Sequence, residues 1–147
     1  MQLSVSPRGG VPKRAVPEAQ VTTLGLAGDW QKNRVLHGGP DRALCLFAIE
    51  VIERLRAEGH PIAPGTAGEN ITVRGVPWGD VLVGDRVELG DDVLVEITAL
   101  TTPCKTIAAS FTRRKFTRIR AHGDSRLYAR VLREGHVRVG DRVVVAP

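Results

Sequence analysis

Aromatic residues are scarce in this chain of 147 residues, at 4% of the sequence, although hydrophobic residues of all kinds reach 42%. A core must therefore be built from Val, Leu, Ile and Ala, and the many valines favour strands over helices. Charged residues make up 25%, an ordinary share for a globular protein. The formal net charge of +5 suits an anionic ligand or nucleic acid but does not choose between them.

Cysteine is also rare, because the sequence contains only Cys45 and Cys104. Two cysteines are too few for a disulfide framework, and no other ligand-rich pattern surrounds them. The N-terminal residues form no apolar signal segment, and no stretch approaches the roughly 18 apolar residues of a membrane span. We therefore expect a cytoplasmic protein with reduced thiols, and the length predicts a single domain over residues 1–147.

Short strands dominate the predicted secondary structure. Alternating or Val-rich segments bounded by turn residues predict strands at 2–6, 19–24, 69–74, 86–89, 93–99 and 142–145. Helical spacing predicts one long helix over 41–58 and two short helices at 106–111 and 124–133. This pattern predicts an α+β fold that is mainly β, namely a β-barrel with one long and two short inserted helices.

Two details of the pattern carry structural expectations. Cys45 falls in the apolar start of the long predicted helix, so we interpret it as a small buried core residue. The segments 81–87 (VLVGDRV) and 137–143 (VRVGDRV) resemble each other, and Gly-Asp in each supplies a tight turn between Val-rich strands. We expect these segments to form two similar corners of the barrel.

Cys104 is the strongest candidate for chemistry. It lies between a predicted strand and a short predicted helix, with Pro103 before it and Lys105 after it. A helix start and a neighbouring lysine both favour the thiolate, which is the form that binds soft metals and attacks sulfur or carbonyl centres. The alternative is an inert buried cysteine.

Two other loops combine glycine with polar side chains. The segment His37-Gly38-Gly39-Pro40-Asp41-Arg42 precedes the long predicted helix. Its glycine amides can approach an anion, and its arginine can add a forked donor. The pair Glu69-Asn70 follows a Gly-Thr-Ala-Gly loop, and its amide can read a heterocycle through one donor and one acceptor. The alternatives are an ordinary turn, a surface histidine and an ion pair with an arginine.

The run 113–120 (RRKFTRIR) contains five basic residues out of eight. A solvated face is the usual explanation of such a run, but it can also steer an anionic ligand or touch a phosphate backbone. Because a single aromatic residue is interleaved, the stacking platform of a single-strand binder is missing. We therefore expect that this run is not a nucleic-acid site.

Taken in order, five segments of the chain resemble the MOSC family, named for the C-terminal domain of molybdenum cofactor sulfurase. They are Gly9-Gly10-Val11-Pro12-Lys13, His37-Gly38-Gly39-Pro40-Asp41-Arg42-Ala43-Leu44, Gly68-Glu69-Asn70-Ile71, Pro103-Cys104-Lys105-Thr106 and Leu127-Tyr128-Ala129-Arg130-Val131-Leu132. The resemblance implies a mainly β fold with a barrel core and a pocket for molybdenum cofactor (molybdopterin), a pterin dithiolene that bears phosphate. It also implies that Cys104 ligates molybdenum in a reductase of N-hydroxylated compounds, whereas other members are thought to carry or transfer sulfur.

The same resemblance implies roles for further residues. Lys13 and Arg42 would meet anionic groups of the cofactor, while His37, Glu69 and Asn70 would line the pocket. The full cofactor-binding set expected here is Lys13, His37, Gly38, Gly39, Arg42, Glu69, Asn70 and Lys105. The chain departs from its relatives at 122–126 (HGDSR), where they often carry Pro-Gly-Trp-Ser-Arg, and its basic run is richer. Both departures bear on substrate choice more than on fold.

Three functions follow as hypotheses. The first is a molybdenum-cofactor enzyme that reduces N-hydroxylated or N-oxide compounds, with Cys104 as catalytic residue and metal ligand. Because the sequence holds no dinucleotide motif and no cysteine cluster, this enzyme requires an external reductase as electron donor. The second is a sulfur-transfer protein that carries a persulfide on Cys104. The third is a basic β-barrel that binds nucleic acid without catalysis.

Overall fold

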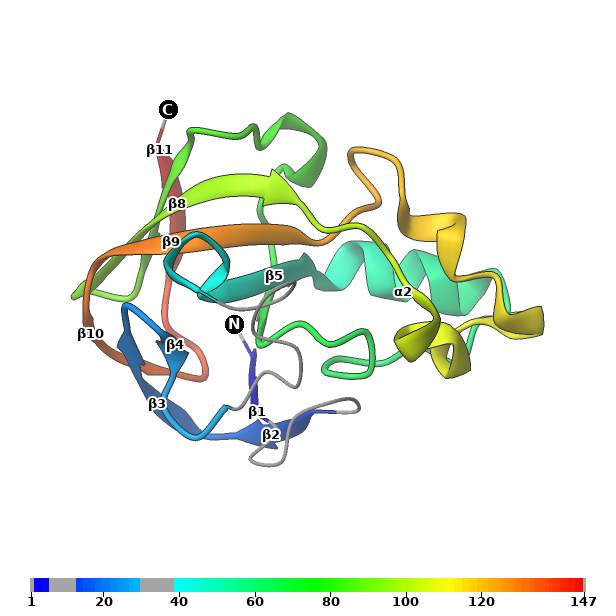
Figure 1. Ribbon diagram of the computed structural model, residues 1–147, viewed down its shortest axis with the longest axis horizontal. Helices are drawn as coiled ribbons and strands as arrows, with labels where there is room; N and C mark the ends of the chain where they lie inside the picture. The colour runs from blue at the N-terminus through cyan, green and yellow to red at the C-terminus, as the bar shows by residue number, and fades with distance from the viewer. Residues whose placement is uncertain (1, 6–12, 30–38, 147) are drawn as a thin grey trace.

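Short strands and a few helical segments make up the protein in the computed structural model, which describes residues 2–5, 13–29 and 39–146 (Figure 1). The strands are β1 (Gln2–Val5), β2 (Arg14–Val16), β3 (Glu18–Thr22), β4 (Gly25–Leu26), β5 (Leu44–Ala48), β6 (Ile71–Val73), β7 (Arg86–Leu89), β8 (Val93–Leu100), β9 (Leu127–Arg133), β10 (Gly135–Arg138) and β11 (Val143–Ala146). The helical segments are the α-helix α2 (Ile49–Ala57) and the 3₁₀ helices η1 (Pro40–Arg42), η2 (Trp78–Asp80), η3 (Lys105–Ser110), η4 (Thr112–Arg114) and η5 (Phe116–Ile119).

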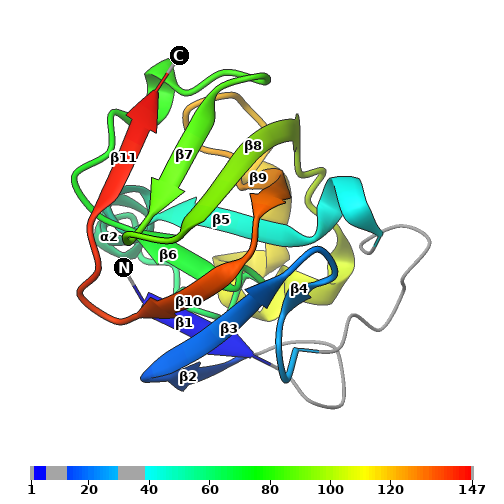
Figure 2. The same ribbon diagram turned by 90° about the vertical axis from the view of Figure 1, so that its left-hand side faces the viewer.

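Eight strands form one curled sheet in the order β11-β7-β8-β9-β5-β6-β1-β2, and β10, β3 and β4 form a second sheet. Among the strand pairs that the structure describes, all are antiparallel except β5 with β6, which is parallel. The curled sheet forms a half-barrel, and the small sheet lies beside β1 and β2 (Figure 2). The expected fold, mainly β and barrel-like with few helices, is therefore confirmed.

Side-chain alternation turns one face of these strands toward the core. In the hairpin of β7 and β8, Val87 and Val95 are buried and paired, whereas Arg86 and Glu88 are exposed. This period of two is typical of a strand with one face on the core. The hairpin expected from 86–89 and 93–99 is confirmed.

The long helix expected over 41–58 is wrong in its first half. Leu44–Ala48 forms β5, and α2 begins only at Ile49. All five residues of β5 are buried, because β9 and β6 flank the strand and both of its faces are covered. A short apolar run without alternation does not distinguish a strand from a helix. Cys45 is buried as expected, but it lies in this strand.

The short helix expected over 124–133 is also wrong, because Leu127–Arg133 forms β9 between β8 and β5. Its apolar residues alternate, and Leu127, Ala129 and Val131 are all buried. The short helix expected at 106–111 is present as η3, and η4 and η5 follow it directly.

The two similar Gly-Asp segments form the same turn. The backbone N–H of Leu82 donates to Oδ2 of Asp85, and that of Arg138 donates to Oδ2 of Asp141, both at 2.9 Å. The intervening glycines hold φ values of 97° and 94°, which glycine adopts without strain. The turns lead into β7 and β11, which pair antiparallel, with Arg86 opposite Ala146 and Val143 opposite Leu89. The two expected corners therefore lie at opposite ends of this strand pair.

Candidate functional site

Buried polar side chains gather on the outer face of the central strands. Cys45 of β5 lies opposite Tyr128 of β9, so the two side chains share one face of the sheet. Arg126 lies two residues before Tyr128, and Sγ of Cys45 lies 3.8 Å from Oγ1 of Thr101. All four residues are buried, and a buried arginine is unusual.

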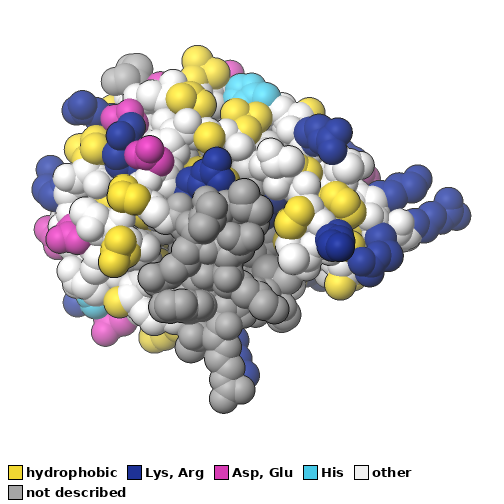
Figure 3. All heavy atoms as spheres, in the orientation of Figure 1, with side chains coloured by type: hydrophobic (Ala, Val, Ile, Leu, Met, Phe, Trp, Pro, Cys, Tyr) yellow, Lys and Arg dark blue, Asp and Glu magenta, His cyan; other side chains and the backbone are white. Residues whose placement is uncertain are grey.

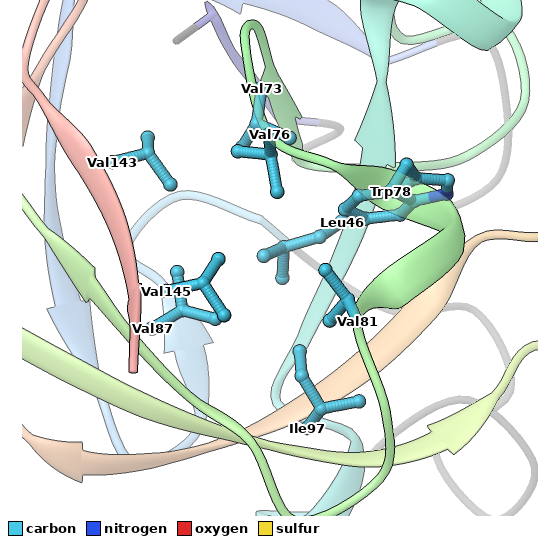
Figure 4. Close-up of a pocket in the computed structure, with 9 residues that line it drawn as sticks. All are labelled: Leu46, Val73, Val76, Trp78, Val81, Val87, Ile97, Val143 and Val145. Carbon is cyan, nitrogen blue, oxygen red and sulfur yellow. The ribbon is translucent and has the colours of Figure 1, made fainter. Parts of the chain in front are cut away.

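The opposite face of these strands forms the barrel interior, where a small hollow is lined only by apolar side chains (Figure 4). The lining residues are Leu46, Val73, Val76, Trp78, Val81, Val87, Ile97, Val143 and Val145. The volume of the hollow is about 10 Å³, which is roughly the minimum that holds one water molecule. Because it is this small and apolar, we assign the candidate site to the outer face.

Lys13 and Asn70, two residues of the expected set, meet at Asp29. Nζ of Lys13 donates to both carboxylate oxygens of Asp29, at 2.8 and 2.7 Å, and only 8% and 3% of the two side chains are exposed. Nδ2 of Asn70 donates to the same carboxylate at 3.3 Å, while Oδ1 of Asn70 accepts the backbone N–H of Cys45 at 2.8 Å. The charge of Lys13 is therefore compensated within the protein, as a buried charge requires.

Glu69 and Arg126 lie buried beside this network. Oε1 of Glu69 accepts the backbone N–H of Gly65 at 2.9 Å, and Nη1 of Arg126 donates to the carbonyl oxygen of Ala67 at 2.7 Å. Among the described residues, Oε2 of Glu69 and Nε of Arg126 have no hydrogen-bond partner. A buried polar atom without a partner is unfavourable, so both atoms would be stabilised by a polar partner.

Burial also changes the proton affinities on this face. Desolvation raises the pKa of Glu69 to about 7, against the lowering effects of hydrogen bonds and of a nearby arginine. Desolvation is likewise the main reason why the pKa of Tyr128 rises to about 12. It also raises the pKa of the Cys45 thiol. At neutral pH, Tyr128 and Cys45 are therefore protonated. Glu69, with a pKa near neutral pH, is present in both its protonated and its ionised form.

Cys104 directly precedes η3 and follows the end of β8. It is partly exposed, in contrast to Cys45, and its Sγ contacts the hydroxyl group of Thr106. The guanidinium carbon of Arg42 lies 5.3 Å from the centre of the Tyr128 ring, within the range of a cation–π contact. Arg42 therefore packs over the ring of Tyr128 on the outer face.

The other residues of the expected set are placed as follows. Gly39 has a φ of 88°, and its carbonyl oxygen accepts the backbone N–H of Arg42 at 3.1 Å. Lys105 is exposed at the first position of η3. His37 and Gly38 lie outside the described residues, as do residues 9–12 of the first expected segment.

Sequence reasoning missed Asp29, Arg126 and Tyr128 as members of the site. Arg126 lies in the segment 122–126, which departs from the family pattern, and Tyr128 lies in the matching stretch 127–132. Asp29 gave no such signal. A buried lysine requires a counter-ion, but nothing in the spacing indicates which carboxylate supplies it.

A family model described as the MOSC domain matches residues 33–144 of the chain. The chain belongs to the MOSC domain family. It is 31% identical over 134 residues to the uncharacterized protein YflK of Bacillus subtilis, covering 89% of this chain and 60% of YflK. It is 31% identical over 112 residues to a protein named reductase from Gibberella moniliformis, covering 73% of this chain and 20% of that protein.

Solved structures agree with this family assignment. YiiM from Geobacillus stearothermophilus is similar with a TM-score of 0.72 and 27% identity, covering 94% of this chain and 65% of that one. This MOSC chain therefore spans less than two thirds of the length of YflK and of YiiM. In the part of the chain that the structure describes, no helix is long and apolar enough to cross a membrane.

Proposed function

We propose that this MOSC protein binds molybdenum cofactor with Cys104 as the metal ligand and reduces N-hydroxylated or N-oxide compounds with electrons from an external donor. The observation that carries the proposal is the partly exposed thiol of Cys104 near a buried polar face with two unpartnered atoms, Oε2 of Glu69 and Nε of Arg126. Membership of the MOSC family and similarity to a protein named reductase support it.

The residues present fit such a cofactor. Among the described residues, no three His, Cys, Asp or Glu side chains gather as a metal site. In this proposal, the dithiolene of the cofactor would supply further ligands to a metal at Cys104. A pterin ring offers N–H donors and oxygen or nitrogen acceptors, which match the unpartnered atoms of Glu69 and Arg126. Arg42 suits an anionic group of the cofactor.

Lys13 acts differently in this proposal from the direct contact expected from the sequence. Its Nζ is held by both oxygens of Asp29, and its backbone N–H donates to the carbonyl oxygen of Gly65 at 3.0 Å. We infer that Lys13 orders the loop that carries Glu69 and, through Asp29, the side chain of Asn70.

The cofactor, when bound, supplies two-electron transfer at molybdenum. Reduction of an N–OH group to N–H consumes two electrons and two protons and releases water, so the protein must also manage protons. Tyr128, with a pKa of about 12, keeps its proton at neutral pH. Glu69, with a pKa of about 7, can release and regain a proton near neutral pH. Both side chains are buried, which limits competition from bulk water.

Turnover by two cysteine variants tests this function. Wild type, Cys104→Ser and Cys45→Ser are purified from a host that makes molybdenum cofactor and assayed with an N-hydroxylated amidine and reduced methyl viologen. We expect Cys104→Ser to lose turnover, because an alcohol oxygen is a harder and poorer ligand than a thiolate. We expect Cys45→Ser, which makes the same atomic change at a buried strand position, to retain it. Turnover by Cys104→Ser at the wild-type rate would contradict the proposal.

Sulfur transfer is the second candidate, and the partial exposure of Cys104 favours it. In that reaction the Cys104 thiolate would take a sulfur atom from the persulfide of a cysteine desulfurase and release the desulfurase thiolate. Mass spectrometry after incubation with a desulfurase would then find a persulfide on wild type and none on Cys104→Ser. Ready charging of a protein that contains neither molybdenum nor pterin would favour this candidate over the reductase.

A further inference from the structure

Four cationic side chains project from the segment that follows η3. They belong to Arg113, Arg114, Lys115 and Arg120, which we call the basic lobe. All four residues are exposed, and among the described residues none of their charged groups forms an ion pair. Lys and Arg side chains protrude at the end of the molecule where η4 and η5 lie (Figure 3). This end of the protein is therefore strongly positive.

The backbone of the basic lobe is strained. Arg113 and Arg114 hold φ values of 55° and 57°, and they are the only non-glycine residues with positive φ in the described part of the chain. Glycine would adopt this left-handed conformation without strain. Such outliers persist only where the surroundings fix them, and they concentrate at functional sites. Here the two outliers place neighbouring arginine residues on one exposed turn.

Neighbouring contacts fix the lobe to the end of α2. Arg118 donates to both oxygens of Glu58 at 2.9 and 2.7 Å and to Asp124 at 2.8 Å. Thr112 donates through its hydroxyl to the carbonyl oxygen of Gly59 at 2.7 Å. Arg118 thus pairs with the carboxylates of Glu58 and Asp124. Within the described residues, the cations of the basic lobe therefore have no carboxylate partner.

The basic lobe lies close to Cys104 along the chain. Only η3 and Phe111 separate Cys104 from Thr112, and a six-residue 3₁₀ helix is roughly 12 Å long. A macromolecule that binds the lobe therefore also lies near the candidate site.

We propose that the basic lobe docks an acidic protein that delivers electrons to the site at Cys104. This inference rests on the proposed function, because reduction of an N–OH group needs an external donor. Transient electron-transfer complexes have small interfaces and depend on complementary charge. The lobe is less suited to single-stranded nucleic acid, because none of its four residues is aromatic and the neighbouring Phe116 packs against the core instead of offering a stacking surface.

A binding experiment with two matched double variants tests the docking. The probes are a flavodoxin and a plant-type ferredoxin, both small acidic electron carriers, titrated calorimetrically at low and at physiological ionic strength. Arg113→Gln with Arg114→Gln removes two charges from the lobe. Arg86→Gln with Arg142→Gln removes two exposed charges on β7 and just before β11, at the other end of the molecule (Figure 1).

We expect at least one probe to bind wild type with an affinity that falls as salt increases, and the lobe variant to bind roughly tenfold more weakly. The control variant should bind as wild type does. Electron transfer from the same probe should slow in parallel, whereas reduction by the small reagents dithionite and methyl viologen should not be lost. Binding needs no molybdenum, so a failure of the proposed function leaves this readout intact.

Three results would overturn the docking proposal. One is the absence of binding to either probe at low salt. Another is an equal loss of affinity in both double variants, which would indicate a general charge effect. The third is tighter binding of a duplex or single-stranded oligonucleotide than of either protein at physiological salt, which would make the lobe a nucleic-acid site.

Discussion

Glu69 allows a quantitative test of the buried polar face, because its carboxyl group is fully buried and its pKa rises from 4.5 to about 7. A carboxyl group whose pKa is higher in the folded than in the unfolded state opposes folding when it ionises. Stability is therefore highest below the unfolded pKa and falls as pH rises, by roughly 1.4 kcal/mol per pH unit until the folded pKa is passed. The total loss at alkaline pH is about 3 kcal/mol.

Glu69→Gln removes this ionisation and keeps a side-chain oxygen that can accept the N–H of Gly65. Urea unfolding of wild type and variant near pH 5 and near pH 8 isolates the effect, and we expect the variant to gain about 2 to 3 kcal/mol relative to wild type between them. Glu88→Gln, at an exposed position of β7, is the matched control and should follow wild type. If wild type and Glu69→Gln lose stability in parallel, the assignment of a buried, partly protonated carboxyl is refuted.

Three further substitutions test the structure. Asp29→Asn leaves the charge of Lys13 buried without its counter-ion and should lower the free energy of unfolding by about 3 to 5 kcal/mol in urea; a loss within error of zero would contradict the buried pair. Gly25→Ala places a Cβ 2.5 Å from the backbone oxygen of Ala43 at a φ of 119° and should lower the free energy of unfolding by about 2 kcal/mol or more. Its control is Gly79→Ala, which has open space around it and should change that free energy by less than about 0.5 kcal/mol. Cys45→Ala truncates a buried strand residue and should lose on the order of 1 kcal/mol while retaining turnover; lost turnover in a stably folded variant would give Cys45 a functional role.

The barrel could be predicted from the sequence because several strands alternate between buried and exposed residues and end at Gly-Asp turns. The segments 86–89 and 93–99 show this alternation, and they pair as expected. The strand Leu44–Ala48 could not be recognised, because burial on both faces erases the alternation and leaves an apolar run that continues into α2. The strand Leu127–Arg133 was mistaken for a helix for a related reason, since its outward residues Tyr128 and Arg130 pack against neighbours instead of facing water.

The candidate site was predictable as a set of segments but not as a set of contacts. The sequence indicated Lys13, Asn70 and Cys104 through loops with unusual composition and through resemblance to a family. It did not indicate that Asp29 joins Lys13 to Asn70, because this contact depends on how distant strands pair. Cross-strand pairing of Cys45 with Tyr128 likewise exists only once β5 and β9 lie side by side.

Molybdenum and pterin content tests the central claim most directly. Wild-type protein is purified from a host that makes molybdenum cofactor and analysed for the metal by mass spectrometry and for the pterin by fluorescence after oxidation. We predict molybdenum and pterin in equal amounts in wild type, with a lower content of molybdenum in Cys104→Ser and an unchanged content in Cys45→Ser. Wild-type protein that contains neither molybdenum nor pterin, although a known molybdenum enzyme from the same host is loaded, would contradict the account.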